Sequence, residues 1–147
     1  MTELDKDVAR IIGIYQSAAF DKNVDAFMRL YDPSVRVFDA WGVWAYEGAP
    51  AWRRAVEGWF TSLGTERVRV SFDDVLAWAG KDVSSVSAIV TYAAVAAPGA
   101  APHRKMHNRI TWVLRTVGHV PRIVHEHTSA PLGFDDSKAI LQRKNSP

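Results

Sequence analysis

The hydrophobic residues near the N-terminus recur at the spacing of one face of an α-helix. They fall at positions i, i+4, i+7, i+8 and i+11, namely Leu4, Val8, Ile11, Ile12, Tyr15 and Ala19. Thr2 is placed to cap such a helix, and Glu3 and Asp5 bring negative charge to its first turn. The pattern predicts an amphipathic helix that ends at a break over residues 21–23.

Two further helices are predicted before residue 65. A short one covers residues 24–31 and is closed by Asp32-Pro33, because the residue before a proline disfavours the helical conformation. The other begins at Ala49-Pro50, where proline suits the first turn, and stops at Gly64. Its apolar residues repeat the first spacing: Trp52, Val56, Trp59, Phe60 and Leu63.

The remaining segments have the alternation of β-strands. Residues 34–41 are predicted as a strand with a short hairpin partner over 44–47. After Gly64 the period changes from about 3.6 to about 2, which predicts four strands over 67–78, 83–96, 105–117 and 122–129. The polar residues 135–147 are predicted to form a tail, so the domain itself spans residues 1–134.

Helices that precede a run of consecutive strands are typical of the α+β class. We predict a cone-shaped, curved antiparallel sheet wrapped on three N-terminal helices. The strand over 83–96 is interpreted as apolar on both faces, so the second face of the sheet is also expected to be covered. A twofold-related copy is the simplest cover, and a homodimer is therefore expected.

The composition argues against several classes of function. Hydrophobic residues make up 48% and charged residues 23%, which is ordinary for a globular protein, and the net charge of +2 gives no reason to expect nucleic acid or a membrane as partner. With 0 cysteines there is no disulfide, thiolate nucleophile or cysteine-based zinc site. The polar, charged N-terminus has no signal-peptide pattern, so a cytoplasmic protein is expected.

Aromatic residues reach 11% of the chain, with 6 tryptophans. Tryptophan is large and its indole N–H needs a partner when buried, so this number suggests a roomy, aromatic-lined interior. Most of these residues are expected to belong to the core, and some of them also to a ligand-binding pocket. The candidates are Trp41, Trp59, Phe60, Trp78, Tyr92 and Trp112.

Three segments resemble known families. The run YQSAAFDKNVDAFMRLYDPSVRVFD, from Tyr15 to Asp39, resembles bacterial ketosteroid isomerases, and Gly42 falls on their turn glycine. The segment VHEHTSAP, residues 124–131, is similar to the end of SnoaL-like domains and of the calcium/calmodulin-dependent protein kinase II association domain. Together with Tyr46-Glu47-Gly48, these segments resemble the nuclear transport factor 2-like superfamily, which implies a cystatin-like α+β roll with a pocket.

The resemblance to the isomerases implies roles for two residues. Tyr15 falls on their oxyanion donor, and Asp39 on the aspartate that shuttles the proton. The isomerases also carry a second acid on a later strand, but residues 110–113 contain no carboxylate. Pro121 stands where a tryptophan is common. The resemblance therefore implies the fold more firmly than it implies a steroid isomerase.

The residues themselves are compatible with acid–base chemistry. Asp39 interrupts a run of aromatic side chains, so burial would raise its pKa towards that of a useful base. Tyr15 would then donate a hydrogen bond to an oxyanion that forms on the substrate. In the alternative interpretation Asp39 caps the turn over 40–42, and Tyr15 is a core residue with its hydroxyl at the rim.

The last two predicted strands hold a second set of candidates. Strict alternation puts Ile123, His125 and His127 on one face of the last strand, opposite Val124, Glu126 and Thr128. If His127 and Arg109 point inward, they would orient a carboxylate or enolate.

Two alternatives stay open for this cluster. In one, Arg109 and Glu126 form a cross-strand ion pair while His125 belongs to a dimer face. In the other, His125 and His127 chelate zinc, but a third ligand such as His107 or Asp39 would be needed, so no metal and no cofactor is expected.

The leading hypothesis is a pocket protein for a small, mostly apolar molecule with a carbonyl group. Asp39, Tyr15 and His127 would perform acid–base chemistry of the isomerase, cyclase or dehydratase type, with Arg109 as an orienting group. Two alternatives use the same fold, a non-catalytic ligand-binding or sensing module and an oligomerisation domain.

Overall fold

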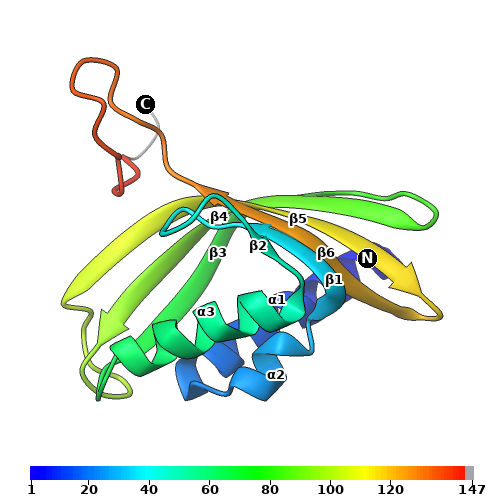
Figure 1. The fold of residues 1–147 in the computed structure, drawn as a ribbon, viewed down its shortest axis with the longest axis horizontal. Coiled ribbons are helices and arrows are strands. Elements are labelled where there is room, and N and C mark those ends of the chain that lie inside the picture. Colours follow the sequence, from blue (N-terminus) through cyan, green and yellow to red (C-terminus); the bar gives the residue numbers. More distant parts are fainter. Residues whose placement is uncertain (145–147) are drawn as a thin grey trace.

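The computed structural model describes residues 1–144 and has three helices and six strands. The helices are α1 (Glu3–Asp21), α2 (Val24–Met28) and α3 (Ala49–Ser62). The strands are β1 (Tyr31–Phe38), β2 (Tyr46–Glu47), β3 (Arg67–Trp78), β4 (Val83–Val95), β5 (Arg104–Val117) and β6 (Val120–Ser129). The helices lie together against the concave side of one curved sheet (Figure 1), so the predicted α+β class is confirmed.

The sheet is mixed rather than antiparallel. Its strand order is β2-β1-β6-β5-β4-β3, and β1 runs parallel to its neighbour β6 while the other pairs are antiparallel. The antiparallel prediction was wrong at this one pair because β1 and β6 lie far apart in the sequence. Since no hairpin connects them, the local pattern carries no signal for their direction.

Strand β1 begins earlier than predicted. The Asp32-Pro33 pair does not close a helix, since α2 ends at Met28 and the strand already starts at Tyr31. Proline has no N–H to give to a ladder, and the pairing of β1 with β6 shifts its register between Tyr31 and Arg36. The irregular pairing accommodates the proline inside the strand.

The core fills the space between the helices and the inner face of the sheet. Its largest fully buried side chains include Trp112, Phe27, Ile11, Leu114 and Ile123. On β4 the inward row is apolar, whereas Ser87 and Thr91 lie half-buried in the outward row beside Ile89. The outer face of this strand is therefore more polar than predicted.

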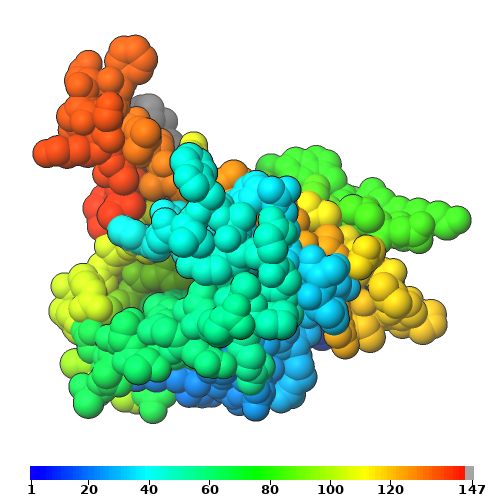
Figure 2. All heavy atoms as spheres, in the orientation of Figure 1, coloured from blue at the N-terminus to red at the C-terminus, as the bar shows by residue number. Residues whose placement is uncertain are grey.

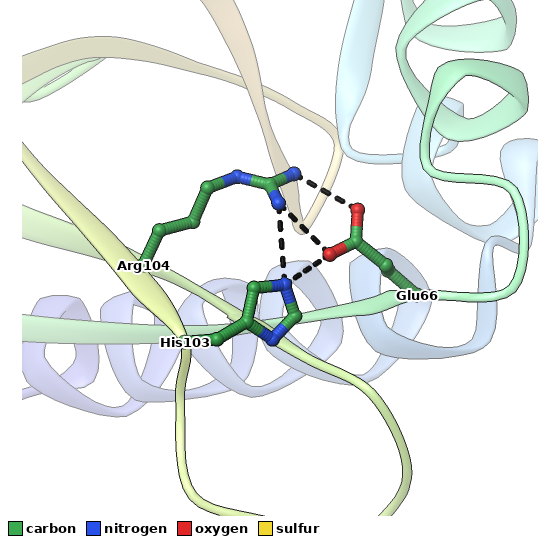
Figure 3. Close-up of polar contacts among 3 residues, drawn as sticks. All are labelled: Glu66, His103 and Arg104. Atoms are coloured by element: carbon green, nitrogen blue, oxygen red, sulfur yellow. Dashed lines mark hydrogen bonds and ion pairs between the residues drawn. The ribbon is translucent and has the colours of Figure 1, made fainter.

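An ion cluster fastens the loop after α3 to the start of β5. Arg104 donates two hydrogen bonds to the Glu66 carboxylate, at 2.8 and 3.0 Å, and His103 contacts the same carboxylate (Figure 3). A bidentate arginine–carboxylate pair fixes geometry as well as charge. The cluster therefore joins the helical layer to the sheet at one end of the domain.

The segment after β6 has more structure than the simple polar tail predicted for residues 135–147. Residues 131–140 form a closed loop, and the Leu141 carbonyl accepts a hydrogen bond of 2.8 Å from the His107 N–H of β5. Residues 145–147 lie outside the described part of the chain. No helix within residues 1–144 has the length and apolar character to cross a membrane.

Candidate functional site

A cavity of about 360 Å³ lies between the helices and the inner face of the sheet. Helix α3 forms one wall, the strands form the opposite wall, and the loop after β1 forms the rim. In Figure 2 the surface is hollowed between this cyan loop and the green helix α3. The volume falls within the range of small-molecule sites and corresponds to roughly twelve water molecules at about 30 Å³ each.

The walls of the cavity are mostly aromatic and aliphatic. They are formed by Tyr15, Trp41, Gly42, Tyr46, Trp52, Ala55, Val56, Trp59, Tyr92 and Met106, with Asp39, Asn108 and Glu126 as acidic and amide groups. Trp52 packs against Tyr46 at a ring distance of 5.3 Å, and Trp59 against Tyr92 at 5.8 Å. A planar or aromatic molecule would find flat partners on several sides.

Asp39 comes directly after β1, at the rim of the cavity. Its Oδ1 accepts a hydrogen bond of 2.9 Å from the Thr128 hydroxyl, and the Trp41 N–H lies 3.4 Å from Oδ2. Burial raises the pKa of Asp39, and these hydrogen bonds offset part of the rise because they favour the charged form. The side chain therefore both organises the turn and presents a carboxylate to the cavity. The two interpretations of Asp39, as a turn cap and as a carboxylate in the pocket, are compatible.

Tyr15 and Tyr92 form a hydroxyl pair in the same cavity, with 2.8 Å between their oxygens. Tyr15 comes from α1 and Tyr92 from β4. Burial raises the pKa of both phenols well above the ordinary value, so both stay protonated. One hydroxyl donates to the other, which leaves the second proton of the pair free for a ligand oxygen.

Glu126 of β6 is the carboxyl group that the sequence interpretation missed. The Tyr31 hydroxyl donates to its Oε1 at 2.7 Å and the Trp112 indole at 2.9 Å. The side chain lines the cavity and is only 1% exposed, and both of these hydrogen bonds go to Oε1 and not to Oε2. Burial raises the pKa of Glu126 to about 7, and the charge of Asp39 adds to the rise.

Alternation had placed Glu126 on the face opposite His127, and the structure turns the Glu126 face, not the His127 face, towards the cavity. Glu126 is the register partner of Trp112, so it lies directly across the ladder from residues 110–113, which contain no carboxylate. A carboxyl group on the neighbouring strand reaches the same cavity. The pairing of β5 with β6 is not encoded in the local pattern of either strand, so the sequence alone does not place Glu126 in the cavity.

His127 and Arg109 point away from the cavity, on the outer face of the sheet. Arg109 donates to the Ser129 hydroxyl at 3.0 Å, and His127 packs edge-on against Phe38 at 5.5 Å. Their predicted role, to orient a ligand, required both side chains to point into the cavity. They do not, so the prediction was wrong for both residues. Arg109 also lies on the opposite face from Glu126, so the two form no cross-strand pair.

A β-bulge explains part of this arrangement. The pairing of β5 with β6 shifts between Val113 and Leu114, so Val124 is an extra residue between Ile123 and His125. A bulge changes which residues share a face. Ile123 is consequently buried on the inner face with Glu126, whereas strict alternation had grouped it with His125.

The predicted aromatic residues divide into three groups. Trp41, Trp59 and Tyr92 line the cavity. Phe60 and Trp112 are buried in the core, and Trp112 supports the cavity through its hydrogen bond to Glu126. Trp78 is exposed at the end of β3. The sequence pattern does not distinguish these three groups, because all six residues are of the aromatic type expected in a core.

Two further cavity residues carry buried polar atoms. Asn108 shares the inner face of β5 with Ile110 and Trp112, as alternation predicts, and its Oδ1 has no hydrogen-bond partner within residues 1–144. The Nε1 of Trp52 is also unpartnered among the described residues. Within residues 1–144 no group of three or more potential metal ligands comes together, and His107 instead accepts from the Arg143 N–H.

Residues 8–133 match the sequence model of the SnoaL-like domain. No curated protein matches the chain. Among solved structures, an NTF2-like protein of unknown function from Pseudomonas putida KT2440 is 20% identical, with a TM-score of 0.84 and 98% of each chain covered.

Two other solved structures show the same fold at lower identity. ActVI-ORFA from Streptomyces coelicolor is 14% identical, with a TM-score of 0.76 over 87% of this chain and 97% of that one. A putative calcium/calmodulin dependent protein kinase II association domain from Xanthomonas campestris is 14% identical, with a TM-score of 0.70 over 84% and 85%.

Proposed function

The chain belongs to the SnoaL-like domain family, and on that premise we propose that its cavity binds a small, mostly apolar carbonyl compound and catalyses acid–base chemistry on it. The reaction would be of the isomerase, cyclase or dehydratase type and would need no cofactor. One observation carries the proposal: two carboxyl groups, Asp39 and Glu126, lie in one aromatic-walled cavity in different environments. Such a difference separates an acid from a base.

The hydrogen bonds assign the two roles. Asp39 is held by Thr128 near the rim, and its ionised form is the general base. Glu126 is deeper, and its raised pKa keeps it largely protonated up to about pH 7. A protonated Glu126 can donate from Oε2, the oxygen that Tyr31 and Trp112 leave free.

A proton-transfer sequence follows from these roles. Asp39 takes a proton from the carbon beside the carbonyl, and the electron pair moves to the carbonyl oxygen. Glu126 gives its proton to that oxygen, so an enol forms while Glu126 becomes a carboxylate. The Tyr15–Tyr92 pair donates a hydrogen bond to the developing charge. Return of the proton from Asp39 to another carbon, with recovery of the Glu126 proton, gives an isomer.

Deuterium uptake by 2-tetralone tests this proposal. This bicyclic aromatic ketone has acidic protons beside its carbonyl, and exchange in D2O is followed by proton NMR. The wild type is expected to accelerate exchange over buffer, and Asp39→Asn to lose roughly 100-fold or more of that rate. Asparagine keeps the shape of the side chain and an oxygen for Thr128, so the loss reports on the base.

Arg109→Gln is the matched control, because Arg109 lies on the outer face of the sheet. It should exchange within about twofold of the wild type. Binding of 2-tetralone without any acceleration by the wild type, and with equal affinity in Asp39→Asn, would contradict catalysis and favour the sensing module. No binding at all would contradict the pocket proposal itself.

A further inference from the structure

Asn108 is a polar residue whose neighbours on its own strand and on β4 are apolar. It lies on the inner face of β5 between Met106 and Ile110, and its register partner on β4 is Val90. Only 4% of Asn108 is exposed, although asparagine is seldom buried in this way. No group within residues 1–144 donates a hydrogen bond to its Oδ1. The position therefore holds a hydrogen-bond acceptor that the fold itself does not use.

An acceptor of this kind needs a reason other than packing. Its oxygen gives up hydrogen bonds to bulk water on burial and gains none from the protein, which destabilises the folded state. Leucine or valine would fill an inner-face position without this cost. Buried polar groups without a partner in the protein are expected mainly where function decides the residue. Asn108 lines the cavity, so recognition of a ligand is a function that its position allows.

The register of the sheet sets Asn108 and Glu126 at different ends of the cavity. Glu126 is the register partner of Trp112, which lies four residues further along β5 than Asn108. Four residues of an antiparallel strand span about 14 Å. Thr128 lies at the level between them on β6, and its hydroxyl is bonded to Asp39. The general base of the proposed reaction therefore lies between the acid at one end and the free acceptor at the other.

We propose that Asn108 selects ligands that carry a hydrogen-bond donor, a hydroxyl or an N–H, at the end opposite their reacting carbonyl. The inference rests on the proposed function, in which the carbonyl oxygen meets Glu126 and the Tyr15–Tyr92 pair. An amide oxygen only accepts hydrogen bonds, so Oδ1 cannot bind a carbonyl oxygen. The two ends of the cavity thus bind different groups, and a ligand that has both groups binds in one orientation.

This contact determines specificity more than it determines the rate of proton transfer. A ligand without the donor leaves Oδ1 unpaired, so it binds without the gain in affinity that a ligand with the donor obtains. A site that hydrogen-bonds a hydroxyl rejects the analogue that lacks it more strongly than an apolar pocket rejects a missing methylene. Asn108 contacts neither the carbonyl nor the carbon that loses its proton in this arrangement. It is therefore a specificity residue of the cavity.

Isothermal titration calorimetry of the wild type with four ketones tests the inference. In 6-hydroxy-2-tetralone and 7-hydroxy-2-tetralone the hydroxyl lies at the far end of the bicycle from the carbonyl. In 6-methoxy-2-tetralone the oxygen at that end cannot donate, and 2-tetralone has no group there. The tighter of the two hydroxy ketones should bind about tenfold or more tightly than both 2-tetralone and the methoxy ketone. Equal dissociation constants for all four ketones would overturn the inference.

Variants of Asn108 show whether this residue causes the preference. In Asn108→Leu the preference for the hydroxyl should fall to about twofold or less, while 2-tetralone binds at least as well as it does to the wild type. Asn108→Ala removes the same acceptor without adding bulk and should give the same loss of preference. Met106→Leu is the matched control, because Met106 also lines the cavity from β5 and the preference should persist. A preference that survives in both Asn108 variants would assign the hydroxyl to Asp39 or Glu126 and overturn the inference.

Binding and exchange separate this inference from the proposed reaction. A hydroxyl preference that depends on Asn108, without any acceleration of deuterium exchange, would support the specificity role and contradict catalysis. Accelerated exchange of 2-tetralone without a hydroxyl preference would support catalysis and overturn the specificity role. Failure of all four ketones to bind would contradict both.

Discussion

Replacing Glu126 by glutamine is expected to stabilise the protein at alkaline pH and to leave its stability little changed at acid pH. Glutamine has nearly the same shape, and its oxygen can still accept from Tyr31 and Trp112. The substitution therefore removes the charge and little else. Burial of the Glu126 carboxyl costs little free energy while the group is protonated, but it destabilises the folded state once the group ionises.

The size and sign of the effect follow from the pKa of Glu126. Burial raises that pKa from 4.5 to about 7. Below pH 4.5 the group is protonated in both the folded and the unfolded chain, so it costs nothing. As the pH rises, the unfolded chain releases the proton first, and stability falls until the folded state also ionises near pH 7. The whole loss is about 3 kcal/mol, which glutamine avoids.

Urea unfolding at pH 5 and pH 8 measures this difference. At pH 8 Glu126→Gln is expected to exceed the wild type by about 3 kcal/mol, or about 10 °C in Tm for a chain of this size, and at pH 5 by far less. Glu57→Gln is the control, because Glu57 pairs with Arg53 on the exposed face of α3 and should show no such dependence. Parallel curves for wild type and Glu126→Gln from pH 5 to pH 8 would refute the reasoning.

Three further substitutions test the surroundings of the site. Thr128→Val removes a hydrogen bond that favours ionised Asp39, so the pKa of Asp39 rises, and the acid limb of the exchange activity should move to higher pH. Tyr31→Phe removes a donor to Glu126 and should raise its pKa further, which carboxyl NMR can measure. Glu66→Gln breaks the pair with Arg104 and should lower Tm slightly at neutral pH, with the difference lost at about 1 M NaCl.

The helical layer could be predicted from the sequence because its signals are local. The spacing of Val8, Ile11 and Tyr15 marks the buried face of α1, and that of Trp52 and Val56 marks the buried face of α3. Thr2 caps α1 through a capping box, as its position suggested. In each case the residues that decide the structure lie within a few positions of one another.

The sheet was predicted less completely because its deciding contacts are distant. Strands β1 and β6 pair although four other strands and a helix separate them in the sequence, and their parallel direction has no local signature. The bulge at Val124 changes the face of Ile123 without any glycine or proline to announce it. One irregular residue is enough to mislead an alternation argument, because side chains alternate with a period of two.

The candidate site shows the same contrast between residues that the sequence indicates and residues that only distant contacts bring into place. Asp39 and Tyr15 were proposed through resemblance, and the structure brings both to one cavity. Glu126 was not predicted as a cavity residue, because its role depends on its cross-strand position beside Trp112 and on its complete burial. His127 was favoured for its motif, yet it lies on the outer face of the sheet, beside Phe38. Residue type indicated the chemistry, but only the fold decides which groups share a cavity.

The pH profile of 2-tetralone deuterium exchange tests the central claim most directly, since it needs Asp39 ionised and Glu126 protonated at once. The account predicts a bell-shaped rate that rises as Asp39 loses its proton and falls as Glu126 loses its own near pH 7. Glu126→Gln should remove the alkaline limb. A wild-type rate equal to that of buffer across the whole range, or a profile that Glu126→Gln leaves unchanged, would contradict the account.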